Sequence, residues 1–409
     1  MSLGEEEHVG QRHSAWLAVA GVCGVYFSFG LTTGVMAPLV NEISVDLGLS
    51  RSTMGSILGA WALIYVFTAV PAGAVVDRLG LRWSLAIGGL SIAASALLRA
   101  AAGGAVSLFL AVAVFGVGGP LVSIATPKLV ASLFDEQQRR LPTGLGVAAP
   151  ALGSAIALGV TNPLLLPLAG GRWRGVMLIV AAVTILSTFG WLFASRAVSH
   201  VRQGATRTDL STLLRLLRLE SMRWILLVGL FSFFFSHGLG NWLPELLEAT
   251  GRSDNVAGYL AALSVTVGIV GSLTIARLVP SDSRPAGLVV IGVTLGATVI
   301  GLTALPLGLV VVALAAMGFA RAGVIPLLFL EIMGDDNIEV SDIGAATGLF
   351  FAVSEIGGFS GPYVAGYVAD QSEGFGAVTV LFAVVAVAIA AAAVLLASER
   401  KSERRRRTP

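Results

Sequence analysis

Gly73-Ala74-Val75-Val76-Asp77-Arg78-Leu79-Gly80-Leu81-Arg82 is the stretch of sequence that decides the fold. It ends one long apolar segment and begins the next, and its pattern is G-x-x-x-D-R-x-G-x-R. Two apolar helices that meet at so tight a turn need a small residue for close approach. They also need an acid at the junction and bases that anchor the turn at the lipid head groups. The stretch therefore predicts a turn between two membrane-spanning helices.

The composition is typical of a membrane protein. Of the 409 residues, 56% are hydrophobic and 12% are charged, whereas soluble proteins carry about 25% charged residues. The single cysteine, Cys23, lies in an apolar segment, so no intrachain disulfide can form. We expect no cleavable signal peptide, because residues 1–14 are polar and the apolar run that follows is too long for a signal core. The basic residues lack interleaved aromatic residues, which argues against nucleic-acid binding.

The opening stretch resembles the signature of the major facilitator superfamily of secondary transporters, which lies between the second and third helices. All five signature positions match: Gly73, Asp77, Arg78, Gly80 and Arg82. The resemblance implies an all-α membrane protein, with twelve transmembrane helices in two pseudo-symmetric six-helix bundles. It also implies that the motif is part of an inner gate. Asp77 and the motif arginines, Arg78 and Arg82, would then pair with the start of span eleven in the outward-facing form.

Apolar runs of about 20 residues, the length that crosses a bilayer core, follow one another along the whole chain. We count twelve, near 15–40, 53–76, 83–101, 105–133, 142–168, 174–196, 222–248, 255–277, 286–304, 307–333, 343–369 and 375–397. The longest polar stretch divides them into two sets of six. The predicted units are an N-terminal bundle (1–196), a cytoplasmic linker (197–221), a C-terminal bundle (222–397) and a basic cytoplasmic tail (398–409).

The two halves repeat one another. Thr143-Gly144-Leu145 opens span five, and Thr347-Gly348-Leu349 opens span eleven, 204 residues later. Gly153 and Gly357 match at the same spacing. Duplicated halves with a shared binding site near the bilayer midplane are a transporter architecture.

The distribution of basic residues predicts the orientation. With the N-terminus inside, most of the 26 Lys and Arg residues lie in inner segments, as the positive-inside rule requires. We therefore predict a multi-pass protein of the plasma membrane with both termini in the cytoplasm. The run 404–407 either lies against anionic lipid or forms a solvated tail. The expected outer segments hold only Arg51, Arg99, Arg172, Arg174 and Arg252.

Two ionisable residues inside spans are candidate functional groups, because charges at membrane depth usually face a cavity or a partner. Arg321 lies about halfway along span ten, which the resemblance places at the central cavity. A guanidinium suits a carboxylate or a similar anion, so we predict that Arg321 binds substrate. The alternative is a buried pair with Glu355 of span eleven. Glu355 is the candidate proton-coupling site. Burial raises the pKa of a carboxyl group and a nearby arginine lowers it, so its charge could depend on whether substrate is bound. Its alternative is a static partner role.

Span seven carries a polar stripe. His237, Asn241, Glu245 and Glu248 share one helical face. We expect the two glutamates to be solvated at the outward end. His237 and Asn241 lie deeper and are candidate substrate contacts, with a hydrogen-bonded structural histidine as the alternative.

Hydroxyl groups in two further spans are candidate substrate contacts, although such groups often bond to their own backbone. They are Ser28 and Thr32 in span one, and Ser123 and Thr126 in span four. Trp61 and Tyr65 of span two are interpreted as packing residues.

We predict a secondary active transporter of a small organic or inorganic anion, coupled to protons and working by alternating access as a monomer in the lipid bilayer. Asn241-Trp242-Leu243-Pro244 and the region from Ala346 to Pro362 are loosely similar to the cyanate and nitroimidazole permease branch. The first alternative is proton-driven efflux of amphipathic drugs. The glycine-rich span-five motif of drug antiporters is degenerate here, with Ala149 before Pro150. The second is a non-transporting receptor.

The sequence does not point to an enzyme. It has no phosphate-cradling loop, no Cys/His metal spacing and no hydrolase elbow. We therefore expect no catalytic residues, no cofactor and no metal site.

Overall fold

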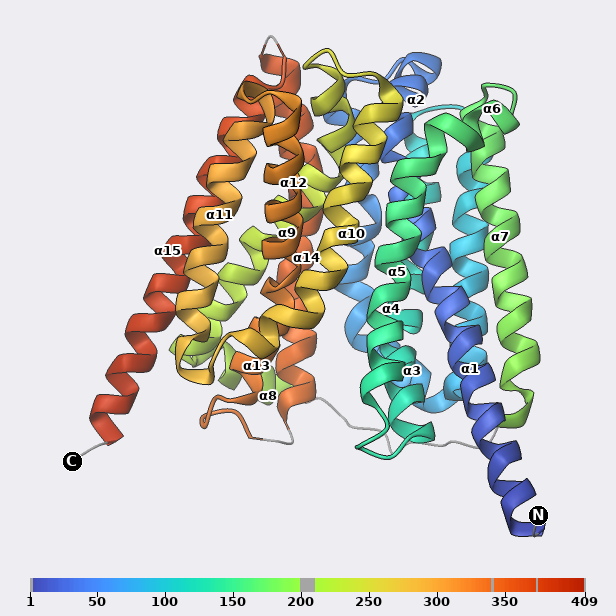
Figure 1. The fold of residues 1–409 in the computed structure, drawn as a ribbon, viewed down its shortest axis with the longest axis vertical. Coiled ribbons are helices and arrows are strands. Elements are labelled where there is room, and N and C mark those ends of the chain that lie inside the picture. Colours follow the sequence, from blue (N-terminus) through green and yellow to red (C-terminus); the bar gives the residue numbers. More distant parts are fainter. Residues whose placement is uncertain (1–2, 199–209, 340–341, 373, 408–409) are drawn as a thin grey trace.

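The computed structural model describes residues 3–198, 210–339, 342–372 and 374–407, and within these ranges every regular element is a helix (Figure 1). Eleven of these helical segments are long and apolar enough to cross a membrane. One of them, α3 (Arg51–Ala100), has 50 residues and would be about 75 Å long, whereas the bilayer core is about 30 Å thick. It breaks at Gly80, where φ is 76°, and therefore supplies two spans. The described chain thus makes the twelve crossings that the sequence predicts.

The first six spans precede the linker. They comprise α1 (Leu3–Gly34) with η1 (Ala37–Leu39) and α2 (Val40–Leu47), the two parts of α3, α4 (Ala105–Leu133), α5 (Arg140–Val160) with η2 (Thr161–Leu165) and α6 (Leu166–Leu168), and α7 (Trp173–Ala194).

The short helix η3 (Ser195–Val198) follows α7, and α8 (Leu210–Arg218) lies in the linker. The spans of the second half are made of α9 (Glu220–Glu248), α10 (Asp254–Leu278), η4 (Ser281–Ser283), α11 (Arg284–Ala304), α12 (Leu307–Ala322), α13 (Val324–Met333), α14 (Ile343–Gln371) and α15 (Gly376–Arg407).

The span limits agree with the predicted runs to within a few residues, except at the first and last spans, which are longer. Two segments differ from the expectation. The linker contains the amphipathic helix α8, in which Leu216 is buried and Arg215 is exposed. The helix α15 continues to Arg407, so the predicted tail at 398–409 begins inside a helix. The side chains of the run 404–407 lie outside the described residues.

Both ends of the chain lie at the same end of the bundle (Figure 1), which an even number of crossings requires. We call this end the terminal face and the other end the opposite face. The linker helix α8 lies at the terminal face, and α2 and α6 lie at the opposite face. Arg99, expected in an outer segment, is buried with 1% exposure near the C-terminal end of α3.

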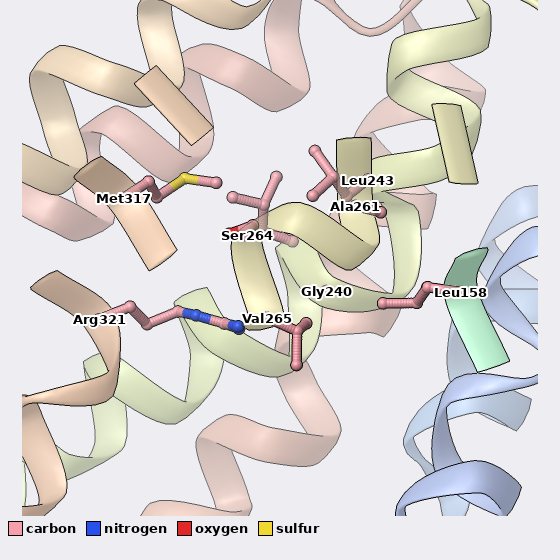
Figure 2. Close-up of a pocket in the computed structure, with 9 residues that line it drawn as sticks. Leu158, Gly240, Leu243, Ala261, Ser264, Val265, Met317 and Arg321 are labelled. Carbon is pink, nitrogen blue, oxygen red and sulfur yellow. The ribbon is translucent and has the colours of Figure 1, made fainter. Parts of the chain in front are cut away.

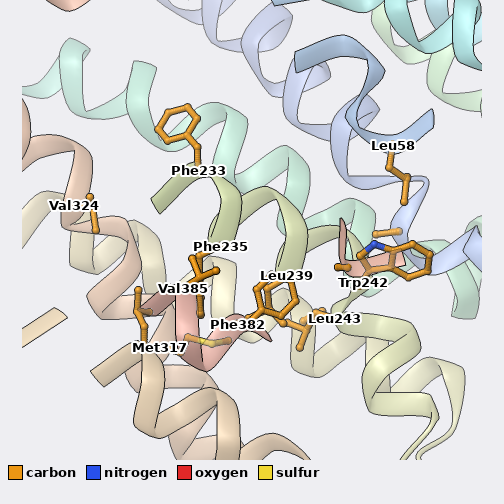
Figure 3. Close-up of a cluster of buried hydrophobic side chains, with 14 of the residues drawn as sticks. Leu58, Phe233, Phe235, Leu239, Trp242, Leu243, Met317, Val324, Phe382 and Val385 are labelled. Carbon is orange, nitrogen blue, oxygen red and sulfur yellow. The ribbon is translucent and has the colours of Figure 1, made fainter. Parts of the chain in front are cut away.

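Close packing holds the helices together. Phe235 of α9 stacks edge-on against Phe382 of α15 with ring centroids 5.6 Å apart, inside a cluster of buried apolar side chains (Figure 3). Lipid tails are as apolar as these side chains, so van der Waals contact stabilises the bundle more than burial does. Glycine permits the closest contacts. A Cβ atom on Gly55 of α3 would lie 2.2 Å from the carbonyl oxygen of Pro362 in α14, where the two halves meet.

Candidate functional site

Arg321 lies where span ten is interrupted. The helix α12 ends one residue later, and α13 begins after Gly323. Pro326 follows in the first turn of α13 and has no backbone N–H, so it cannot continue the hydrogen-bond ladder. Broken helices of this kind line the binding sites of many transporters. The Nη1 atom of Arg321 donates to the carbonyl oxygen of Ser236 in α9, at 3.2 Å.

The Arg321 side chain borders a small cavity between the two halves. Figure 2 shows Arg321 and Leu158 of α5 pointing toward each other from opposite sides of it. Ser264 supplies a hydroxyl group, and the other side chains in the wall are apolar. The volume is about 20 Å³, enough for a single water molecule. A larger solute therefore requires the halves to separate. The full lining is Leu158, Leu239, Gly240, Leu243, Ala261, Ser264, Val265, Met317 and Arg321.

His237 and Glu355 form the second part of the site. The Nδ1 atom of His237 lies 3.7 Å from Oε2 of Glu355, and neither atom has a hydrogen-bond partner among the described residues. Glu355 is 4% exposed. The Trp61 ring, from the first half, lies 5.1 Å from the imidazole ring, and Phe233 lies at 5.2 Å. A carboxyl and an imidazole group are thus enclosed by aromatic rings where the halves meet.

The structure does not form the predicted alternative pair of Arg321 with Glu355. The guanidinium binds a carbonyl group, and the carboxyl group faces His237. Trp61 was expected only to pack, but it brings the first half against the imidazole ring. No local pattern predicts this contact, since it depends on how spans two and seven are rotated.

All four candidate hydroxyl groups bond to carbonyl groups of their own helices. Ser28 donates to the carbonyl of Gly24 at 3.1 Å, and Thr32 donates to that of Ser28 at 2.8 Å. Thr126 donates to the carbonyl of Val122 at 2.7 Å. These contacts agree with the structural alternative weighed for each residue. Their roles as substrate contacts stay predictions.

Ser123 and Asn241 are likewise bonded inside the protein. Ser123 lies 2.6 Å from the hydroxyl of Tyr65 and 3.3 Å from the carbonyl of Pro120. The Nδ2 atom of Asn241 donates to the carbonyl of His237, at 2.8 Å. Asn241 therefore contacts the backbone of the candidate histidine, and its role in substrate binding also stays a prediction.

The signature motif lies at the turn inside α3. Asp77 accepts from Lys128 of α4 at 2.5 Å, so in this structure its partner belongs to the same half. Gly80 has a positive φ of 76°, which only glycine adopts readily. The expectation that Gly73 permits close helix packing is not met here, because a Cβ atom on Gly73 would meet nothing within 4 Å. The carbonyl of Arg82 accepts from the Trp191 indole at 2.9 Å.

The halves are linked at the opposite face by polar contacts. The Nε atom of Arg51 in α3 donates to Glu245 of α9 at 2.8 Å. Asp370 of α14 accepts the backbone N–H of Arg51 at 3.0 Å and that of Ser52 at 2.7 Å, so it caps a helix of the other half. Glu245 is therefore paired with Arg51 rather than simply solvated. We name the cluster of Arg51, Ser52, Glu245 and Asp370 the opposite-face latch.

Comparison with known proteins gives the family. The model of the Major Facilitator Superfamily matches residues 22–335, which is more than half of the chain. The chain therefore belongs to the major facilitator superfamily, as its motif and its twelve crossings indicate. It is a multi-pass membrane protein and a transporter rather than an enzyme. Among the described residues, no group of His, Cys, Asp and Glu is arranged to hold a metal ion.

Three relatives are similar over different lengths. The probable L-galactonate transporter of Escherichia coli (strain K12) is 26% identical over 250 residues, covering 56% of this chain and 54% of that protein. The D-galactonate transporter of Escherichia coli O6:H1 is 23% identical over 85% of this chain and 87% of its own length. Monocarboxylate transporter 11 of Mus musculus is 27% identical over 78% of this chain and 73% of its own length. The match to the first thus spans about half of that protein.

Proposed function

We propose that this protein is a secondary active transporter of a small organic anion whose carboxylate binds Arg321. The observation that carries the proposal is a guanidinium that borders a cavity between the halves and binds only a carbonyl group among the described residues. A carboxylate matches the guanidinium fork with two parallel hydrogen bonds. Movement of the halves about this cavity would expose it to each face in turn.

The relatives support the carboxylate as the recognised group. Two of them are named for galactonate and one for monocarboxylates, and all these compounds carry a carboxylate. The apolar wall of the cavity strengthens a charged hydrogen bond by excluding water. An inorganic anion, which the sequence left open, has no such support.

Proton coupling through Glu355 is the finer part of the proposal. The Nδ1 atom of His237 lies 3.7 Å from Oε2 of Glu355, beyond hydrogen-bond distance but close enough for the charge of each group to affect the other, so the pair titrates as a unit. Arg321, Tyr65 and Trp61 also lie near the pair, and the amide of Asn241 donates to the backbone carbonyl of His237. Protonation would remove a buried negative charge, and the closed arrangement of the halves would then be cheaper to form.

We further propose that the terminal face is cytoplasmic and that the protein lies in the plasma membrane as a monomer. The basic residues of the loops gather at the terminal face, which the positive-inside rule assigns to the cytoplasm. One chain supplies both sides of the cavity, from α5 and from α9, α10 and α12. The motif of Asp77 and Arg78 would then act in the inner gate.

Efflux of an amphipathic drug is the second candidate, and the observation that favours it is the apolar lining around Arg321. Uptake of radiolabelled galactonate and of an amphipathic dye into proteoliposomes separates the two candidates. We expect the wild type to take up galactonate and Arg321→Ala to lose this activity. Galactonate uptake equal to that of the wild type in Arg321→Ala would contradict anion binding at Arg321. Dye transport that survives the substitution, without galactonate uptake by the wild type, would favour drug efflux.

A further inference from the structure

Asn162 lies in an unusual turn of span five. The π-helix η2 covers Thr161–Leu165 between α5 and α6. Such turns are rare in helices and often occur at functional sites, because the wider turn re-aims the side chains. Thr161 bonds through its hydroxyl to the carbonyl of Ala157 at 2.6 Å. The hydroxyl group of Thr161 is therefore hydrogen-bonded within the helix, whereas the side chain of Asn162 is not.

The amide group of Asn162 has no protein partner. Asn162 is 9% exposed, and neither its Nδ2 nor its Oδ1 atom has a hydrogen-bond partner among the described residues. Buried polar groups in folded proteins are almost always hydrogen-bonded. An amide donates two hydrogen bonds and accepts two. This turn thus holds a donor and an acceptor side by side, and neither contributes to the fold.

The position of Asn162 relates it to Arg321. Leu158 lies four residues earlier, so the two side chains share one face of the span. Leu158 lines the cavity into which Arg321 points (Figure 2). This face packs on α10 of the other half, since a Cβ atom on Gly258 would lie 2.6 Å from the carbonyl oxygen of Leu158. Asn162 therefore lies about one turn from the cavity, toward the opposite face.

We propose that Asn162 binds hydroxyl groups of the substrate and that the substrate class is the polyhydroxy carboxylic acids. The inference rests on the proposed binding of the carboxylate at Arg321. Each hydroxyl group is both a donor and an acceptor, which matches the two free functions of the amide. Alternating access requires α5 and α10 to separate, and this movement uncovers Asn162 on the path from the opposite face. A carboxylate without hydroxyl groups would leave the amide unpaired and bind less well.

Calorimetric binding to the purified full-length protein tests the proposal. The probes are galactonate, a six-carbon acid rich in hydroxyl groups, and hexanoate, a six-carbon acid without them. The variants are Asn162→Leu, which removes the amide, and Thr161→Val, a control that removes the bonded hydroxyl of the same turn. We expect Asn162→Leu to raise the Kd of galactonate by about tenfold or more and to leave that of hexanoate unchanged. Thr161→Val should change neither.

Each outcome bears on the proposal. An unchanged Kd of galactonate in Asn162→Leu overturns it, and so does an equal rise for both acids. Asn162→Ser keeps a smaller polar group and replaces the leucine variant if that variant does not fold. Its expected galactonate Kd is intermediate, and the wild-type value would overturn the proposal.

Arg321→Ala distinguishes the two inferences. Unchanged binding of both acids there refutes the carboxylate site alone, whereas a wild type that binds neither acid refutes both inferences.

Discussion

The carbonyl oxygen of Ser236 accepts a hydrogen bond from Arg321 at 3.2 Å, and the carbonyl of Thr32 accepts one from Arg99 at 2.9 Å. Thr32 and Ser236 are 204 residues apart, the same spacing that relates the two halves. The guanidinium groups come from non-equivalent spans, three and ten. Arg99 is sealed near the ring of Phe115, at 5.9 Å, whereas Arg321 borders the cavity. In each half, a backbone carbonyl at the equivalent position thus accepts a hydrogen bond from an arginine. Only the arginine of the second half borders the central cavity.

This difference predicts opposite results for two conservative substitutions. Arg321→Lys keeps the charge but loses the bidentate fork. We expect the Kd of a carboxylate substrate to rise about tenfold to a hundredfold, because a hydrogen bond to a charged group contributes about 1.5–3 kcal/mol. Arg99→Lys is the matched control and should lower the Tm while leaving the Kd near its wild-type value. Calorimetry and thermal unfolding measure both quantities, and equal binding loss in the two variants would contradict the assignment.

Glu355→Gln tests proton coupling. The amide cannot release a proton, so uptake driven by a pH gradient should fall to background in proteoliposomes. Exchange of labelled for unlabelled substrate at equal pH should continue, since it needs no net proton movement. Glu220→Gln, an exposed site at the start of α9, is the control and should keep both activities. If Glu355→Gln retains gradient-driven uptake, the carboxyl group is not the coupling site.

The opposite-face latch predicts a shift in conformation. Glu245→Gln weakens the contact with Arg51, and Asp370→Asn weakens the cap on α3. Each change should cost the closed latch about 1 kcal/mol, which is about a fivefold change in the ratio of closed to open forms. Spin-label distances across the opposite face, in a Cys23→Ser background, measure this ratio.

Asp46→Asn provides the control for the latch. Asp46 also lies at the opposite face, but its partners Arg174 and Trp173 belong to the same half. Its substitution should not change the distance between the halves. A shift as large as that of Asp370→Asn would show that the loss of any surface carboxylate has this effect.

Gly55→Ala should slow transport by obstructing the contact of the halves. The added Cβ atom would lie 2.2 Å from the carbonyl oxygen of Pro362, a distance at which the backbones must move apart. We expect the rate of substrate exchange to fall at least about tenfold, if the strain is about 1.4 kcal/mol or more. Gly344→Ala, where the Cβ atom meets nothing within 4 Å, should exchange at the wild-type rate. Wild-type exchange by Gly55→Ala would show that the contact is not needed.

The sequence predicted the spans well because each is a mainly apolar run of a length that the bilayer imposes. It also predicted the turn at Gly80 and the family. The amphipathic helix α8 was missed, because its nine residues are too few for a span and lie within the longest polar stretch of the chain. Its Arg215 pairs with Asp342 at the start of span eleven, near the place where the motif arginines were expected to pair.

The site was predicted by residue type but not by pairing. Arg321, His237 and Glu355 stand out because charged and titratable groups are rare in spans. Which of them meet depends on helix rotation and on approach across the two halves, and no local pattern records either. Asn162 was overlooked for a similar reason. A single amide in an apolar run is unremarkable until the structure shows the π-turn and the unsatisfied atoms.

The cap that Asp370 provides for α3 has a consequence for the order of synthesis. The acceptor and the backbone donor of Arg51 are 319 residues apart, so α3 enters the membrane long before its capping residue leaves the ribosome. During translation the first turn of α3 must rely on Ser50, whose hydroxyl accepts from Thr53 at 3.2 Å, and on solvent. The opposite-face latch can form only after span eleven is inserted, so the first half lacks it until synthesis of the chain is nearly complete.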